Sequence, residues 1–90
     1  MNPQNFETLR EQLTTYYSWP ALYMFKFITP AENRVFALLH DLFPEHAEFH
    51  SRPSASGKYV SITVKEIMLS SEEVIERYRK ASAIEGIIVL

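Results

Sequence analysis

The clearest hydrophobic pattern in the chain is a two-residue alternation over residues 59–65. Three aliphatic residues, Val60, Ile62 and Val64, point to one side of a predicted strand, and the residues between them are mostly polar. Gly57 comes just before this segment, where a hairpin turn needs a residue that tolerates positive φ. The pattern predicts a strand with one buried and one polar face, inside a sheet.

Three more segments have strand character. Residues 21–29 alternate, and we assign their aromatic side chains to the core, which leaves Lys26 on the opposite face. Residues 46–52 also alternate, and the turn-forming residues 53–57 predict a hairpin with the strand that follows. Residues 87–90 are apolar at every position and predict a short final strand.

Helical periodicity predicts three helices. Residues 4–17 carry apolar side chains on one arc and form an amphipathic helix. A second helix is expected from the cap residue Thr29 to Phe43, because proline is favoured at the first helical position. A third helix begins at a capping box of Ser70 with Glu73.

The predicted order is a helix followed by β-α-β-β-α-β. It indicates an α+β fold of ferredoxin-like type, a two-layer sandwich with two helices on one face of a four-stranded antiparallel sheet. Right-handed crossovers give the strand order 4-1-3-2. We expect one domain over residues 1–90, with residues 1–18 as a helical extension and residues 19–90 as the ferredoxin-like domain.

The face of this sheet without helices is the predicted interaction face. Alternation places or borders six polar or aromatic candidates on it: Lys26, His50, Lys58, Tyr59, Ser61 and Thr63. The half of the face nearest the last strand is apolar, and monomers rarely leave such a patch uncovered. We expect the N-terminal helix to cover it, through Phe6, Leu9 and Leu13, with weak homodimerisation as the alternative.

Composition narrows the function classes. The chain of 90 residues has a formal net charge of −2 and no cysteine. The charge argues against a general nucleic-acid or polybasic membrane-surface binder. The lack of cysteine excludes disulfides, thiol catalysis and cysteine-ligated metals. We see no signal-peptide pattern and no apolar run near the roughly 20 residues of a membrane span, and expect a cytoplasmic protein.

No arrangement of residues indicates catalysis. The sequence lacks a nucleophile elbow and a recognisable pair of carboxylates, so we expect a protein that is not an enzyme and has no cofactor. His46, Glu48 and His50 could share a strand face, but we interpret them as the polar surface of an edge strand that binds no metal. A tyrosine at residue 59 leaves RNA recognition as a lesser alternative.

Several motifs together resemble a known family. They are Trp19-Pro20, Phe25-Lys26-Phe27-Ile28, Ser56-Gly57-Lys58-Tyr59-Val60-Ser61-Ile62-Thr63-Val64, Tyr78 and Ile84-Glu85-Gly86-Ile87. Over residues 19–90 the chain resembles the YbeD-like family of small bacterial proteins of unknown function. The resemblance implies a ferredoxin-like fold similar to ACT-type regulatory domains, which bind amino acids in metabolic enzymes, and it implies no established activity.

Two functional hypotheses follow. The first is a non-catalytic regulatory or protein-interaction module that acts through the open sheet face on a protein partner. The alternative is an ACT-like sensor of a small ligand such as an amino acid. The sequence identifies neither the partner nor the ligand.

Overall fold

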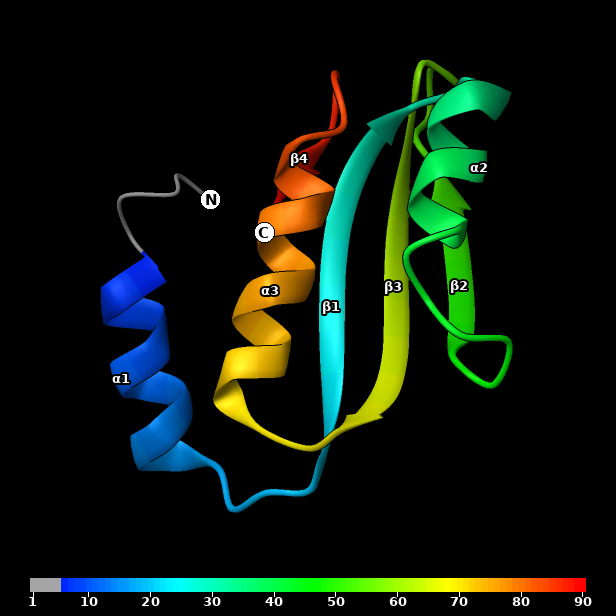
Figure 1. The fold of residues 1–90 in the computed structure, drawn as a ribbon. Coiled ribbons are helices and arrows are strands. Elements are labelled where there is room, and N and C mark those ends of the chain that lie inside the picture. Colours follow the sequence, from blue (N-terminus) through cyan, green and yellow to red (C-terminus); the bar gives the residue numbers. More distant parts are fainter. Residues whose placement is uncertain (1–5) are drawn as a thin grey trace.

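Seven helices and strands follow one another along residues 6–90, the part of the chain that this computed structural model describes. Their bounds are α1 Phe6–Tyr16, β1 Ala21–Pro30, α2 Asn33–His40, β2 Glu48–Pro53, β3 Tyr59–Met68, α3 Ser71–Ser82 and β4 Ile88–Val89 (Figure 1). Residues 4 and 5, which the periodicity assigned to the first helix, lie outside the described part. The α+β class is as predicted.

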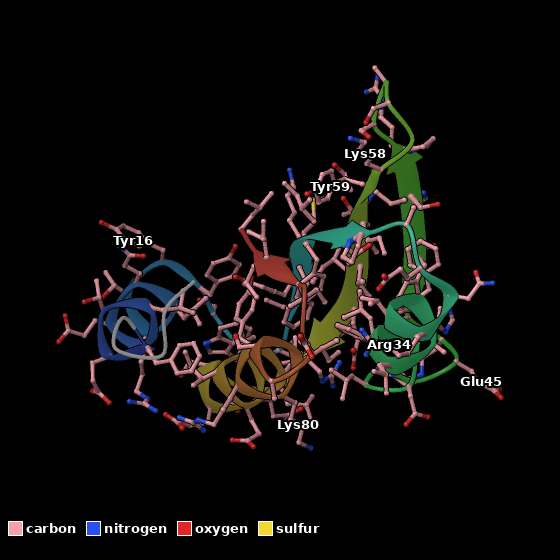
Figure 2. The ribbon with its side chains drawn as sticks, turned by 90° about the horizontal axis from the view of Figure 1, so that it is seen from above. Tyr16, Arg34, Glu45, Lys58, Tyr59 and Lys80 are labelled. Carbon is pink, nitrogen blue, oxygen red and sulfur yellow. The ribbon has the colours of Figure 1, made fainter. Side chains whose placement is uncertain are left out.

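The four strands of residues 6–90 form one antiparallel sheet in the order β2-β3-β1-β4. The same sheet read from its other edge is β4-β1-β3-β2, which is the order 4-1-3-2 in sequence numbering. β1 and β3 are central and pair along their whole lengths, from Ala21 opposite Met68 to Pro30 opposite Tyr59. α2 and α3 lie on the same face of this sheet, and no helix of the described residues lies on the other face (Figure 2).

The core lies between the sheet and these two helices. Phe25, Phe27 and Val64 are fully buried on the helix side of the central strands. The ring of Phe25 meets the rings of Phe43 and Tyr78 edge-on, at centroid distances of 5.3 and 5.2 Å. Aromatic rings bury large areas and favour this geometry, so the alternation of β1 sets the centre of the core as the sequence predicts.

α3 begins at the predicted capping box. The side chain of Ser70 accepts a hydrogen bond from the backbone N–H of Glu73 at 3.2 Å. On the sheet side of the helix, Arg77 donates to the carboxylate of Glu66 on β3, with an N–O distance of 2.5 Å. The guanidinium of Arg77 also lies 4.6 Å from the ring centroid of Phe43. These contacts join α3 to β3 and to the segment that follows α2.

α1 packs beside α3, and the expectation that it covers the open sheet face is wrong (Figure 1). Phe6 and Leu13 are buried in the hydrophobic core cluster. Arg10 pairs with Glu72 at the start of α3, with an Nε–O distance of 2.5 Å. The flank of α3 buries the apolar stripe of α1, and Glu72 pairs with Arg10. Because α1 packs there, it leaves the apolar side chains of the open sheet face exposed.

The start of the second helix also differs from the prediction. β1 continues through Thr29 and Pro30, and α2 begins only at Asn33. Thr29 is fully buried within the strand and caps no helix; Glu32 holds the N-cap position. The reason is that β3 is long: its pairing with β1 extends to Pro30, and the N–H of Ala31 still donates to the carbonyl of Lys58 at 3.0 Å.

The hairpin between β2 and β3 has the predicted glycine conformation. Gly57 has a φ of 76°, in the left-handed region that favours glycine. Ser54 supports the same turn, because its hydroxyl accepts from the N–H of Tyr59 at 3.2 Å. Both edge strands are shorter than expected: β2 begins at Glu48 and β4 pairs with β1 at only Phe27 and Ile28.

Candidate functional site: the open sheet face

The strand alternation defines one surface, here called the open face. It consists of Leu22, Met24, Lys26 and Ile28 from β1, Glu48, His50 and Arg52 from β2, Tyr59, Ser61, Thr63, Lys65 and Ile67 from β3, and Ile88 from β4. None of these side chains is fully buried, whereas their neighbours in β1 and β3 alternate into the core. Figure 2 shows Tyr59 on the side of the sheet opposite α2 and α3, with Lys58 at its margin.

The structure brings the six sequence-predicted residues together. Lys26, Thr63 and His50 lie opposite one another across β1, β3 and β2 and form one row. Ser61 lies in the next row, and Tyr59 opens β3 beyond it. Lys58 precedes the strand and borders the face.

Apolar side chains flank this polar centre. Leu22 on β1 faces Ile67 on β3, and the two are 59% and 60% exposed. At the other end of the face, Ile88 on β4 lies opposite Ile28 on β1 and is half exposed. Exposed apolar side chains gathered on one surface are typical of interaction sites.

The open face is basic although the chain is acidic. Four basic residues, Lys26, Arg52, Lys65 and the bordering Lys58, stand against the single acidic residue Glu48. The remaining sequence holds five basic and ten acidic residues. The sheet therefore separates charge, with a positive open face and a negative remainder.

The basic side chains of the open face have no carboxylate partner within residues 6–90. The ion pairs of this part of the chain involve four arginines on the helices: Arg10, Arg34, Arg77 and Arg79. Each is paired with a glutamate. The positive charges of the open face are thus available to a partner, while the four helix arginines are each paired within the chain.

The six sequence candidates leave out two of the basic residues and two apolar ones. Arg52 and Lys65 lie on the same strand faces as His50 and Thr63, so the alternation alone is enough to place them on the open face. Leu22 and Ile67 were missed because the expected β3 ended too early to place Ile67 opposite β1. That Leu22 lies opposite Ile67 can be established only from the register of β1 and β3.

A second feature is a hollow of about 320 Å³ on the helix side, between α2 and the β2–β3 hairpin. Its lining residues are Phe36, Leu39, His40, Phe49, Ser51, Pro53, Val60 and Ile62. The imidazole of His40 stacks on the ring of Phe49 at a centroid distance of 3.9 Å. No local sequence pattern indicates this hollow, because its walls come from three elements and most of its lining residues are apolar types found in any core.

Among the described residues 6–90, two uncharged titratable groups are buried in contact with each other. The hydroxyls of Tyr23 and Tyr78 lie 3.0 Å apart beneath α3. Burial raises the pKa of Tyr78 above its usual range, and burial also raises the pKa of Tyr23. Both phenols therefore stay protonated at neutral pH, and their shared hydrogen bond satisfies polar groups inside the core.

Within residues 6–90, no group of three or more His, Asp or Glu side chains is placed to hold a metal ion. Of the three residues considered for such a site, Glu48 and His50 lie on β2, and His46 precedes the strand. That these residues bind no metal stays a prediction. Among the described helices, none has the length and apolar composition to cross a membrane.

Fold and surface together define a small α+β domain with one helix-covered and one open sheet face. The chain belongs to the DUF493 family of proteins of unknown function, whose model matches residues 14–90. This match starts near the end of α1, so most of that helix precedes the family region. No curated protein and no solved structure matches the chain.

Proposed function

We propose that this protein is a non-catalytic regulatory or protein-interaction module whose open face docks a partner protein. The observation that supports the proposal is the exposed apolar group at one end of the open face, formed by Leu22, Met24 and Ile67. No element of residues 6–90 packs over it, and α1 lies beside α3 instead. Burial of such side chains against a partner would be favourable by about 25 cal/mol per Å².

A paired substitution tests this proposal. Ile67→Glu removes an exposed apolar side chain from the open face, and Leu38→Glu makes the same kind of change on α2, where Leu38 is 44% exposed. We expect affinity capture with the tagged parent and with the Leu38 variant to retain the same partner, and capture with the Ile67 variant to lose it. Equal capture by both variants would contradict the proposal.

A small-ligand sensor is the second candidate, and the hollow beside α2 favours it. Its volume falls at the lower end of the range of ligand pockets, about 300–1,000 Å³. The resemblance to ACT-type domains points to the same class. However, among the described residues, His40 and Ser51 are the only polar side chains in its lining, and no carboxylate, ammonium or guanidinium of residues 6–90 lines it. This lining suits a ligand with an apolar body better than a free amino acid.

Chemical-shift mapping separates the two candidates. A panel of apolar amino acids and of aromatic compounds without charge would be added to the isotope-labelled protein. A sensor predicts saturable shifts of amides beside the hollow, such as Leu39 and Ile62, and little change on the open face. If no compound in the panel shifts these amides, the result would count against the sensor, and the interaction module would remain as the candidate function.

A further inference from the structure

We infer that the partner of the open face is an acidic protein segment that carries both carboxylates and apolar side chains. This inference rests on the proposed function and names the chemistry of the partner. The observations behind it are the excess of basic residues on the open face and their lack of ion-pair partners within residues 6–90. A charge that loses water on docking costs free energy unless an opposite charge compensates it.

The arrangement of side chains along β1 and β3 shows why the partner needs both properties. Lys26 stands between Met24 and Ile28 on β1, and Lys65 stands between Thr63 and Ile67 on β3. Residues two apart on a strand are separated by about 6.6 Å. A segment that buries the apolar ends of the face therefore passes within reach of the two ammonium groups. Carboxylates at these points would pair with them.

The same charges disfavour a second copy of this chain as the occupant. Two open faces stacked about a twofold axis would bring four basic residues of each copy against four of the other, with one glutamate on each side. The charge of the open face is complementary to the acidic helix side of another copy. However, such a contact joins two different surfaces head to tail, so it does not form a closed dimer. A different, acidic chain satisfies both the charge and the apolar surface.

RNA fits the open face less well than an acidic protein segment. Phosphates would pair with the basic residues, but single-stranded RNA also needs aromatic rings on which its bases stack. Tyr59 is the one non-histidine aromatic side chain on the open face. Bases cannot stack on the exposed aliphatic side chains of Leu22, Ile67 and Ile88 as they do on aromatic rings. These side chains are suited to packing against leucine or valine side chains of a protein.

Defined probes test the chemistry. One short peptide alternates leucine with glutamate, a second replaces glutamate with lysine, a third replaces it with serine, and a labelled oligouridine represents RNA. We expect only the acidic peptide to shift the amides of Lys26, Thr63 and Ile67 in a saturable titration. Its affinity should fall about tenfold or more when the salt concentration rises from 50 mM to 500 mM, because screening weakens exposed charge pairs.

Charge reversal gives the specific control. Lys26→Glu combined with Lys65→Glu should abolish binding of the acidic peptide and create binding of the lysine peptide. Lys80→Glu, an exposed change on α3, should leave binding as in the parent. Thermal unfolding followed by circular dichroism shows whether each variant is folded. Because Lys26 and Lys65 lie on the open face and not in the core, we expect their substitution to preserve the fold.

The outcomes separate this inference from the proposed function. Equal binding of the three peptides, stronger binding of oligouridine, no binding of any probe, or self-association through the open face would each overturn the acidic-partner inference. The proposed function would survive these results if capture still depends on Ile67. If capture is the same for the Ile67 and Leu38 variants, the proposed function fails, whatever the peptides do.

Discussion

The two faces of the sheet are built from alternate residues of the same strands. On β3, Val60, Ile62 and Val64 face the helices and are buried, while Ile67 faces the other way and is 60% exposed. The covered face holds the fold together by packing. The open face has similar apolar side chains that no element of residues 6–90 covers, so packing within this part of the chain does not explain them.

Polar groups show the same contrast. On the covered face, Arg77 pairs with Glu66 and Tyr23 shares a hydrogen bond with Tyr78. On the open face, Lys26 and Lys65 have no ion-pair partner within residues 6–90. Most buried polar groups have a hydrogen-bond partner inside the chain, whereas an exposed group can pair with water or with another molecule. Residues of the covered face should therefore control stability, and residues of the open face should control binding.

The largest expected difference comes from neighbouring residues on β1. Phe25→Ala should lower the free energy of unfolding by about 3–5 kcal/mol, because it leaves a cavity in the aromatic core. Met24→Ala, on the open face, should change it by no more than about 0.5 kcal/mol. Urea unfolding of both variants measures the difference. Similar losses from the two changes would break the comparison between the faces.

Loss of the ion pair beneath α3 should have the next largest effect. Arg77→Ala leaves the carboxylate of Glu66, which is 8% exposed, without its partner. We expect a loss of about 2–3 kcal/mol, between the values for exposed and fully buried pairs. Arg79→Ala, which removes an exposed pair with Glu76, is the matched control and should cost under about 1 kcal/mol. Equal losses would show that Glu66 is effectively solvated.

A smaller effect is expected at the hairpin that joins β2 to β3. Gly57→Ala places a side chain at a φ of 76° and should cost about 1–2 kcal/mol from backbone strain. An added Cβ there has open space around it, so steric contact does not contribute. Ala55→Gly, in the same exposed turn, serves as the control. A neutral result for Gly57→Ala would mean that the turn relaxes to an ordinary conformation.

The pH dependence of stability sharpens the comparison further. The pKa values of Tyr23 and Tyr78 are raised in the folded protein, so the folded state holds these protons more tightly than the unfolded state. Their contribution to stability is complete below the unfolded pKa of about 10 and decreases as the pH rises above it. Urea unfolding between pH 8 and pH 11 measures the slope. Tyr78→Phe should make this slope shallower, because it removes one of the two buried phenols.

Most of the fold could be predicted from local patterns. Alternation in β1 and β3 and the cap at Ser70 act between near neighbours in sequence, and their outcome is the one expected. The placement of α1 could not be predicted in this way. Its apolar stripe fits any apolar surface, and only the pairing of Arg10 with Glu72 and the flank of α3 select one.

The same reasoning explains which parts of the site were found. Candidates such as Lys26 and Thr63 could be predicted because side chains alternate between the two faces along a single strand. The structure places both in one row with His50. The capping signal at Thr29 misled, because long-range pairing of Pro30 with Tyr59 outweighed a local helix preference. The hollow beside α2 depends on three-dimensional packing of side chains from separate elements, which no local pattern encodes.

The most direct test of the account is to locate the contact surface of a captured partner on this chain. The partner, identified by affinity capture, would be added unlabelled to the isotope-labelled protein, and amide shifts would be mapped. If the open face is the docking surface, the largest shifts fall on Leu22, Lys26, Thr63 and Ile67, with small shifts beside the hollow at Leu39. Shifts concentrated on α1, on α3 or around the hollow, with the open face unchanged, would contradict it.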